Sequence, residues 1–204
     1  MELYVEYFVK TIKIVLTTIY ELAGFSLIAA IFFMYFYMSA KKNGWKNEIK
    51  IWLKKFKIDS QFRRVFILVF YVMMILFRTL LNREVWMNPL SNVLGGWGMY
   101  DSNGEFTGET FENLILFIPF TFLLLSCFSK KMSYGVTLFT TVKYSVFISF
   151  LFSIFIEFSQ LFFRLGTFQL ADLFYNTMGG LIGGIIYWIA YRIKDNHNKK
   201  KMHE

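Results

Sequence analysis

The sequence places polar and ionisable side chains near the ends of long apolar runs. Glu157, Gln160 and Arg164 follow one another at spacings of three and four residues where one apolar run ends. Asp172 and Asn176 then open the next run. A bilayer core accepts such groups when they face one another or a wet cavity, so residues of this kind mark a candidate functional site.

Two residues from other apolar runs extend this group. Arg78 lies inside an earlier run, and Asn113 opens the run after it. Arginine, carboxylate and amide side chains together suit an ion-paired network or the recognition of an anionic head group, and a carboxylate can also serve as an acid or base. We call the seven residues the polar set: Arg78, Asn113, Glu157, Gln160, Arg164, Asp172 and Asn176.

Two interpretations of the polar set stay open. Buried polar residues often hold membrane bundles together through hydrogen bonds between helices. The number of costly groups that share one layer favours a functional role instead. Because an unpaired charge at this depth is expensive, we predict that Arg78 pairs with Glu157, with Asp172 as the second candidate. A neighbouring arginine favours the charged carboxylate, which suits an ion pair or an anion site better than a general acid.

The composition indicates a membrane protein. The chain is 56% hydrophobic with 26 Phe, and its mean hydropathy is +0.45. The net charge of +8 is explained by basic residues flanking apolar runs, so no nucleic-acid partner is expected. The single cysteine, Cys127, excludes an internal disulfide framework and is expected to be a small core residue. Both histidines, His197 and His203, follow the last apolar run, and no phosphate-binding glycine loop is present, so neither metal nor cofactor is expected.

The apolar runs predict an all-α, polytopic transmembrane helix bundle with about five spans. A helix needs roughly 20 residues to cross about 30 Å of hydrocarbon. The third run is short and contains Pro119, so it is expected to borrow residues from a flank, to tilt or to kink. The five runs cover about residues 17–38, 65–81, 114–128, 144–163 and 173–191.

The charges between the spans predict the orientation. Residues 41–64 carry nine basic side chains against two acidic ones, whereas residues 82–112 carry one basic and five acidic side chains. The positive-inside rule then places the N-terminus outside and the C-terminus inside. Arg78 and Glu157 both come to lie about 20 Å from the inner boundary, which puts the polar set in the outer part of the membrane. We divide the chain into 1–64 (first helix and basic loop), 65–192 (four-span membrane domain) and 193–204 (basic cytoplasmic tail).

Two further patterns concern packing. Trp45, Ile49, Trp52, Leu53 and Phe56 recur at helical spacing among lysines, which predicts an amphipathic helix on the anionic inner leaflet. The alternative is a solvated connector.

Glycines in the last run form two overlapping pairs, Gly179 with Gly183 and Gly180 with Gly184. Such pairs allow close helix contact, and we expect that contact inside one chain rather than in a dimer. We expect the first pair to share a face with Asp172 and Asn176.

The stretch 86–100 has two open interpretations. Its apolar, glycine-rich composition is compatible with a re-entrant element that dips into the bundle. The turn-forming residues 101–104, Asp-Ser-Asn-Gly, favour a surface loop instead.

These residues together resemble the VanZ-like family of small bacterial membrane proteins, which is named for a teicoplanin-resistance determinant. The resemblance covers about residues 78–191, and two departures from the usual pattern occur at Phe120-Thr121 and within 168–171. It implies a multi-pass protein of the cell membrane, a role at the cell envelope, and lowered susceptibility to lipid-tailed glycopeptides. The residues that carry it are Asn88-Pro89, Asn113, Pro119, Glu157, Gln160, Arg164, Asp172, Asn176, Gly179, Gly180 and Gly183.

Three hypotheses for function follow. In the first, the protein binds an envelope lipid or a lipoglycopeptide: Arg78 and Arg164 hold the anionic head, Glu157 and Asp172 orient the arginines, and the amides donate hydrogen bonds. In the second, it is an intramembrane enzyme acting on lipid-linked wall material, with Glu157 or Asp172 as the base. In the third, it is a structural or regulatory subunit of a membrane complex. The lipid bilayer is the expected surrounding in each case.

Overall fold

A computed structural model describes residues 2–38, 45–81, 85–98, 108–129 and 135–201. Within these ranges all regular structure is helical and no strand occurs, as predicted. The elements are α1 (Glu2–Met38), α2 (Trp45–Ile58), α3 (Ser60–Leu76), the π-helical turn η1 (Phe77–Leu81), α4 (Glu109–Phe128), α5 (Leu138–Phe163) and α6 (Leu170–Lys201).

Four of the predicted spans are long and apolar enough to cross a membrane. They are Ser60–Leu81, Thr110–Phe128, Leu138–Phe163 and Leu170–Lys199. The first predicted span lies within α1, whose apolar stretch Tyr20–Tyr35 extends only about 24 Å. That length is below the roughly 30 Å of hydrocarbon, so the described residues support four spans by length and composition.

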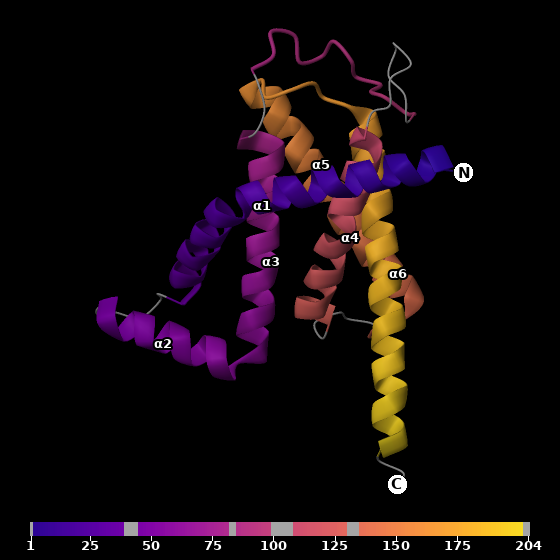
Figure 1. Ribbon diagram of the computed structural model, residues 1–204. Helices are drawn as coiled ribbons and strands as arrows, with labels where there is room; N and C mark the ends of the chain where they lie inside the picture. The colour runs from indigo at the N-terminus through magenta and orange to yellow at the C-terminus, as the bar shows by residue number, and fades with distance from the viewer. Residues whose placement is uncertain (1, 39–44, 82–84, 99–107, 130–134, 202–204) are drawn as a thin grey trace.

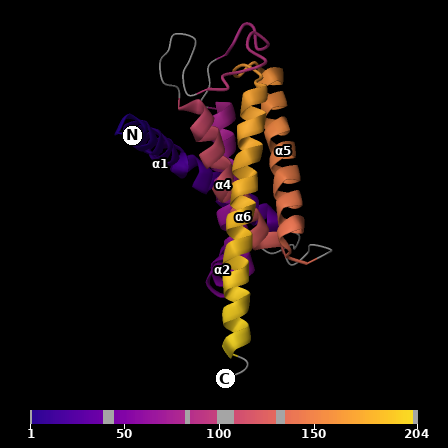
Figure 2. The same ribbon diagram turned by 90° about the vertical axis from the view of Figure 1, so that its right-hand side faces the viewer.

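The helices are arranged with two distinct ends (Figures 1 and 2). At one end, which we call the loop end, lie residues 85–98 and the connection between α5 and α6. At the other, the basic end, lie α2, the end of α4, the start of α5 and the C-terminal part of α6. Helix α6 packs along both α4 and α5 and extends beyond them at the basic end. The first part of α1 lies across the bundle, and its later part descends toward α2.

Positive charge gathers at the basic end of the described chain. Exposed lysines of α2 and the basic residues after Tyr191 lie together at the basic end, and residues 193–201 continue α6 as a helix. The side of the membrane that each end faces remains a prediction. Residues 101–104, Lys41, Lys42, Lys130 and Lys131 lie outside the described residues.

Helix α4 begins five residues before the predicted third span. It starts at Glu109 and ends at Phe128, so it borrows residues from its N-terminal flank as expected and contains Pro119. Its length of about 30 Å is sufficient to cross the hydrocarbon. This extension places Glu112, counted in the sequence as an acidic residue of a loop, on the helix itself.

A sharp corner joins α2 to α3. Asp59 caps α3, since its side chain accepts hydrogen bonds from the backbone N–H groups of Gln61 (2.8 Å) and Phe62 (3.2 Å). Arg63 donates to the carbonyl oxygens of Phe56 and residue 57 at the end of α2. These contacts fix the junction between the two helices. The amphipathic helix predicted from Trp45 to Phe56 is present as α2.

The apolar face of α2 is divided between two surroundings. Trp52 and Phe56 pack against Phe62 and Phe66 of α3 with ring centroids 5.5–5.9 Å apart. Leu53, like Ile49, remains exposed. Part of the face predicted for the inner leaflet thus belongs to the bundle, and the exposed remainder is free to contact lipid.

The core joins α1, α3, α4 and α5. Its buried side chains are Met34, Phe62, Val65, Leu68, Ile75, Leu116, Phe117, Phe120, Cys127 and Ile156. Cys127 is thus a free, buried core residue, as predicted. Tyr71 links α3 to α4 by donating to the carbonyl oxygen of Leu116 at 2.8 Å.

Both glycine pairs of α6 are used inside the chain. A Cβ atom at Gly179 or Gly183 would collide with backbone carbonyls of α4, and one at Gly180 or Gly184 with serine side chains of α5. Because the two pairs face different helices, α6 fits closely between α4 and α5. Asn176 departs from the predicted face: its amide is bonded to α5, whereas Gly179 and Gly183 contact α4.

Residues 85–98 form a surface loop, which we call the strap. They contain turns and bends, most of their side chains are exposed, and they lie over the loop end instead of between the helices. For these residues the surface-loop interpretation is correct and the re-entrant one is wrong. Two backbone hydrogen bonds form turns within the strap, from Ser91 to Asn88 and from Gly95 to Asn92, both 3.1 Å long.

Candidate functional site

Arg78 sits on the π-helical turn that ends the first long span. Its Nη2 donates to a carboxylate oxygen of Glu112 on α4, forming an ion pair in which the two side chains are 25% and 11% exposed. Glu112 is thus a partner that the sequence did not indicate. Pairing of Arg78 with Glu157 or Asp172 stays a prediction. π-helical turns are rare and are frequent at functional sites.

Gln160 joins α5 to the same turn. Its side-chain amide donates to the carbonyl oxygen of Thr79 at 2.8 Å, and both residues are buried. The last carbonyls of a helix lack donors within the helix, so Gln160 supplies one of them. This contact brings Gln160 beside the turn that carries Arg78.

Glu157, one helical turn before Gln160, holds the start of α6. Only 2% of it is exposed, and its Oε2 accepts the backbone N–H of Gln169 at 2.9 Å, just before α6 begins at Leu170. A carboxylate at a helix N-terminus is favoured by the helix dipole and by the donors left free there. This contact gives Glu157 a structural task in positioning α6.

Two further hydrogen bonds connect α6 to its neighbours. Asn113 of α4 donates through Nδ2 to Oδ1 of Asp172 at 2.7 Å. Asn176 donates through Nδ2 to Oγ of Ser153 on α5 at 2.9 Å. Oδ1 of Asn176 is buried and accepts no hydrogen bond within the described part of the chain. A buried acceptor of this kind is costly unless a ligand or water supplies a donor.

Arg164 differs from the rest of the polar set. It ends α5 with φ 57° and ψ 38°, the left-handed conformation that favours glycine. Its backbone carbonyl accepts the N–H of Trp86 at 2.8 Å, which holds the strap. Its side chain is exposed and forms no ion pair within the described ranges. Arg164 therefore places an exposed positive charge at the loop end.

The strap covers the connection between α5 and α6. Backbone hydrogen bonds of 2.9 Å run from Phe168 to the carbonyl of Pro89 and from Leu170 to that of Val93. Gly95 has φ +73°, and a Cβ there would lie 2.8 Å from Oε1 of Gln169, so glycine is required. The phenol of Tyr175 donates to the carbonyl of Trp97 at 2.9 Å. The strap thus lies against Gln169, whose backbone N–H is bonded to Glu157.

Three participants were absent from the sequence prediction: Glu112, Ser153 and Gln169. Glu112 was recognisable only once α4 was known to begin early. Ser153 had a signal, since Thr141, Ser145, Ser149, Ser153 and Glu157 recur every four residues and form one buried face of α5. Gln169 acts through its backbone, which leaves no signal in a side-chain pattern.

The chemistry available here is hydrogen bonding and recognition of charge. Within the described ranges no group of three or more His, Cys, Asp and Glu side chains could hold a metal ion. Three carboxylates have partners: Glu112 pairs with Arg78, Asp172 accepts from Asn113, and Glu157 accepts from the backbone at the start of α6. Within the polar set and the described ranges, the Arg164 guanidinium forms no ion pair and the buried Asn176 carbonyl oxygen accepts no hydrogen bond.

The fold and this polar layer define a helical membrane protein. Residues 22–191 match the VanZ/LLP1 family, so the chain belongs to that family. The match begins within α1, covers α2 to α5 with η1, ends within α6, and includes all seven residues of the polar set. Comparison with curated proteins gives no match, and comparison with solved structures gives none either.

Proposed function

We propose that the protein is a multi-pass protein of the cell membrane that binds the polar head of an envelope lipid or amphiphile at the loop end. Arg164 carries this proposal. A non-glycine residue in the left-handed conformation costs about 1–2 kcal/mol. Retaining an exposed arginine at such a position supports a role for its charge, since glycine would fit the backbone better.

The contacts of the polar set separate side chains that join helices from side chains that remain available to a ligand. Glu112 orients Arg78, whose side chain is still one quarter exposed and so presents a second guanidinium. Asp172 and Glu157 are committed to Asn113 and to the start of α6. The guanidinium groups of Arg78 and Arg164 then remain exposed to the head group, whereas Oδ1 of Asn176 is buried.

The apolar surroundings suit the tail of such a ligand. Exposed aromatic side chains of α5 continue along the helix from the level of Glu157 to its end, among them Phe155, Phe158, Phe162 and Phe163. An amphiphile whose head meets the arginines would place its chain against this surface. The family resemblance directs the proposal to lipid-tailed glycopeptides such as teicoplanin, whose action the protein would weaken.

A susceptibility assay in a sensitive Gram-positive host tests this function. Wild type, Arg164→Gly, Glu157→Gln and Lys194→Gln would be expressed at matched membrane levels, with vancomycin as the comparator without a lipid tail. Lys194 is exposed at the basic end, so its variant controls for the loss of one charge. We expect protection from teicoplanin alone, lost in Arg164→Gly and retained in Lys194→Gln.

Arg164→Gly is the sharpest variant because it separates folding from binding. Removing the left-handed strain should raise stability by about 1 kcal/mol while removing the charge. Loss of protection in a more stable protein would therefore come from the guanidinium. If the wild type protects against neither teicoplanin nor vancomycin, the glycopeptide function is excluded for this chain.

The enzyme hypothesis makes a different prediction for Glu157→Gln. If the carboxylate were a base, the variant would retain ligand binding and lose turnover of lipid-linked wall material. The buried hydrogen bond to Gln169 instead supports a positioning role for Glu157. A variant that loses binding and membrane level together would agree with that role.

A further inference from the structure

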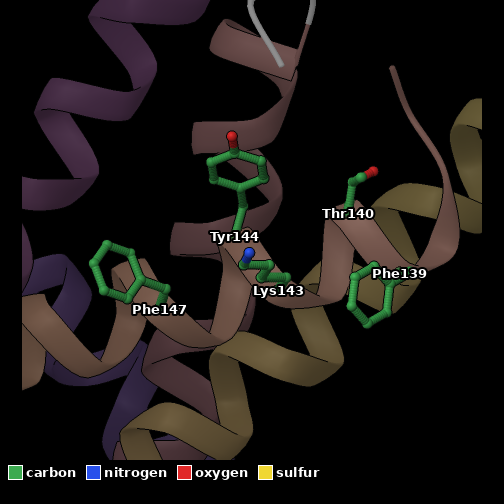
Figure 3. A pocket seen from close by; sticks show the side chains of 5 residues that line it. All are labelled: Phe139, Thr140, Lys143, Tyr144 and Phe147. Atoms are coloured by element: carbon green, nitrogen blue, oxygen red, sulfur yellow. The ribbon is translucent and has the colours of Figure 1, made fainter. Parts of the chain in front are cut away.

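A groove lies on α5 far from the polar set, near the basic end. It has a volume of about 660 Å³, within the size range of small-ligand sites. Its lining residues are Phe139, Thr140, Lys143, Tyr144 and Phe147, all from the first three turns of the helix. Figure 3 shows Lys143 and Tyr144 side by side, with Phe147 on one side and Phe139 and Thr140 on the other.

The charges around this groove are one-sided. Lys143 is the only basic residue of α5, and the only acidic residue of that helix is Glu157 near its far end. Within the described part of the chain, the ion pairs are those of Arg78 and Lys199, so Lys143 has no acidic partner. Exposed lysines of α2 lie at the same end of the bundle. The groove therefore presents an uncompensated positive charge.

The depth of Lys143 suits a lipid head group. It lies about 8 Å along the helix from Leu138, and α5 is longer than the hydrocarbon layer requires. The lysine stem can reach the head-group level while its methylenes remain against apolar surface. Phe139 and Phe147, both exposed, flank it on the same helix face and offer contact to an acyl chain.

We propose that this groove binds one anionic phospholipid of the leaflet at the basic end. The phosphate meets the ammonium group of Lys143, with the phenol ring of Tyr144 as one wall, and the upper acyl chain lies along Phe147 and Phe139. Basic pockets at this depth of membrane helices are suited to acidic lipid head groups. A zwitterionic lipid fits the apolar walls equally well but leaves the charge of Lys143 less compensated.

Native mass spectrometry of the full-length purified protein tests this site. The protein would be exposed to equal amounts of phosphatidylglycerol and phosphatidylcholine with identical chains, and the ratio of single-lipid adducts would be measured. The wild type should prefer phosphatidylglycerol. Lys143→Gln should reduce that preference about fivefold, the value for one lysine near an anionic lipid surface. Lys143→Arg should retain it.

Two controls distinguish a groove from general surface charge. Lys54→Gln removes one exposed charge of α2 outside the groove and should leave the preference unchanged. Phe147→Ala should reduce adducts of both lipids without changing their ratio. The proposal is overturned if Lys143→Gln equals the wild type, or if Lys54→Gln lowers the preference as much as Lys143→Gln.

Discussion

Replacing Gly179 by alanine tests the closest contact in the bundle. The new Cβ would lie within 3.0 Å of the carbonyl oxygen and carbon of Leu114, which are backbone atoms that no rotamer change can move. Restoring the ordinary contact of at least 3.4 Å requires α4 and α6 to separate by about 1 Å. We therefore expect a loss of stability.

The size of that loss follows from two terms. Overpacking a tight contact costs about 1–3 kcal/mol. Where α4 and α6 separate by about 0.5–1 Å, each dispersion contact between them loses roughly a quarter to a half of its energy. The upper part of the range, about 3 kcal/mol, is expected because the obstacle is backbone. The same separation would lengthen the 2.7 Å hydrogen bond between Asn113 and Asp172 beyond bonding range. The close contact of α4 with α6 therefore also supports a hydrogen bond of the polar set.

Unfolding of the purified protein by increasing SDS in mixed micelles would measure this loss. Gly24→Ala is the matched control: it makes the same change in helix α1, where a Cβ would meet nothing within 4 Å. That variant should be neutral or more stable by up to about 1 kcal/mol, the helix-propensity gain. If Gly179→Ala unfolds at the same SDS fraction as Gly24→Ala, the close contact between α4 and α6 is wrong.

Three other predictions concern single contacts. In double-mutant cycles, Arg78 and Glu112 should show a coupling energy of about 1 kcal/mol or more, and no coupling between them would contradict this ion pair. The same cycle on Arg78 and Glu157 tests the pairing predicted from the sequence. Asp59→Ala should lower unfolding stability by about 1 kcal/mol and Asp59→Asn by much less, because asparagine also caps helices; equal losses would exclude the cap. Tyr175→Phe should speed amide exchange in the strap about fivefold by removing a hydrogen bond worth roughly 1 kcal/mol, and unchanged exchange measured by mass spectrometry would contradict that anchor.

Apolar run length predicts where a chain crosses the bilayer, but not where a helix starts. The apolar run begins at Leu114, whereas α4 begins five residues earlier, at Glu109. Glu112 fell between these two limits and was counted as loop, so its pairing with Arg78 could not be predicted. The first span shows the converse. There the helix α1 is longer than the predicted span, but its apolar stretch Tyr20–Tyr35 extends only about 24 Å.

Helical spacing predicted how the glycines of α6 are used. The two glycine pairs follow from helical periodicity alone, and each pair contacts a different helix. Spacing does not identify the partner of a side chain that bonds a backbone group. Glu157 and Gln160 both use main-chain groups, at Gln169 and Thr79. A side-chain pattern contains no information on those partners.

The division between satisfied and unsatisfied polar groups separates architecture from function. Glu157 and Gln160 are buried and bonded to main-chain groups that a helix end leaves without partners. Their replacement should lower the amount of folded protein together with any activity. Arg164 and the carbonyl oxygen of Asn176 stabilise no neighbour, and the structure even carries a backbone cost at Arg164. A protein under selection for stability alone would place glycine at position 164, so loss of activity without loss of folded protein should concentrate at Arg164, because Asn176 also bonds Ser153 of α5 through its Nδ2.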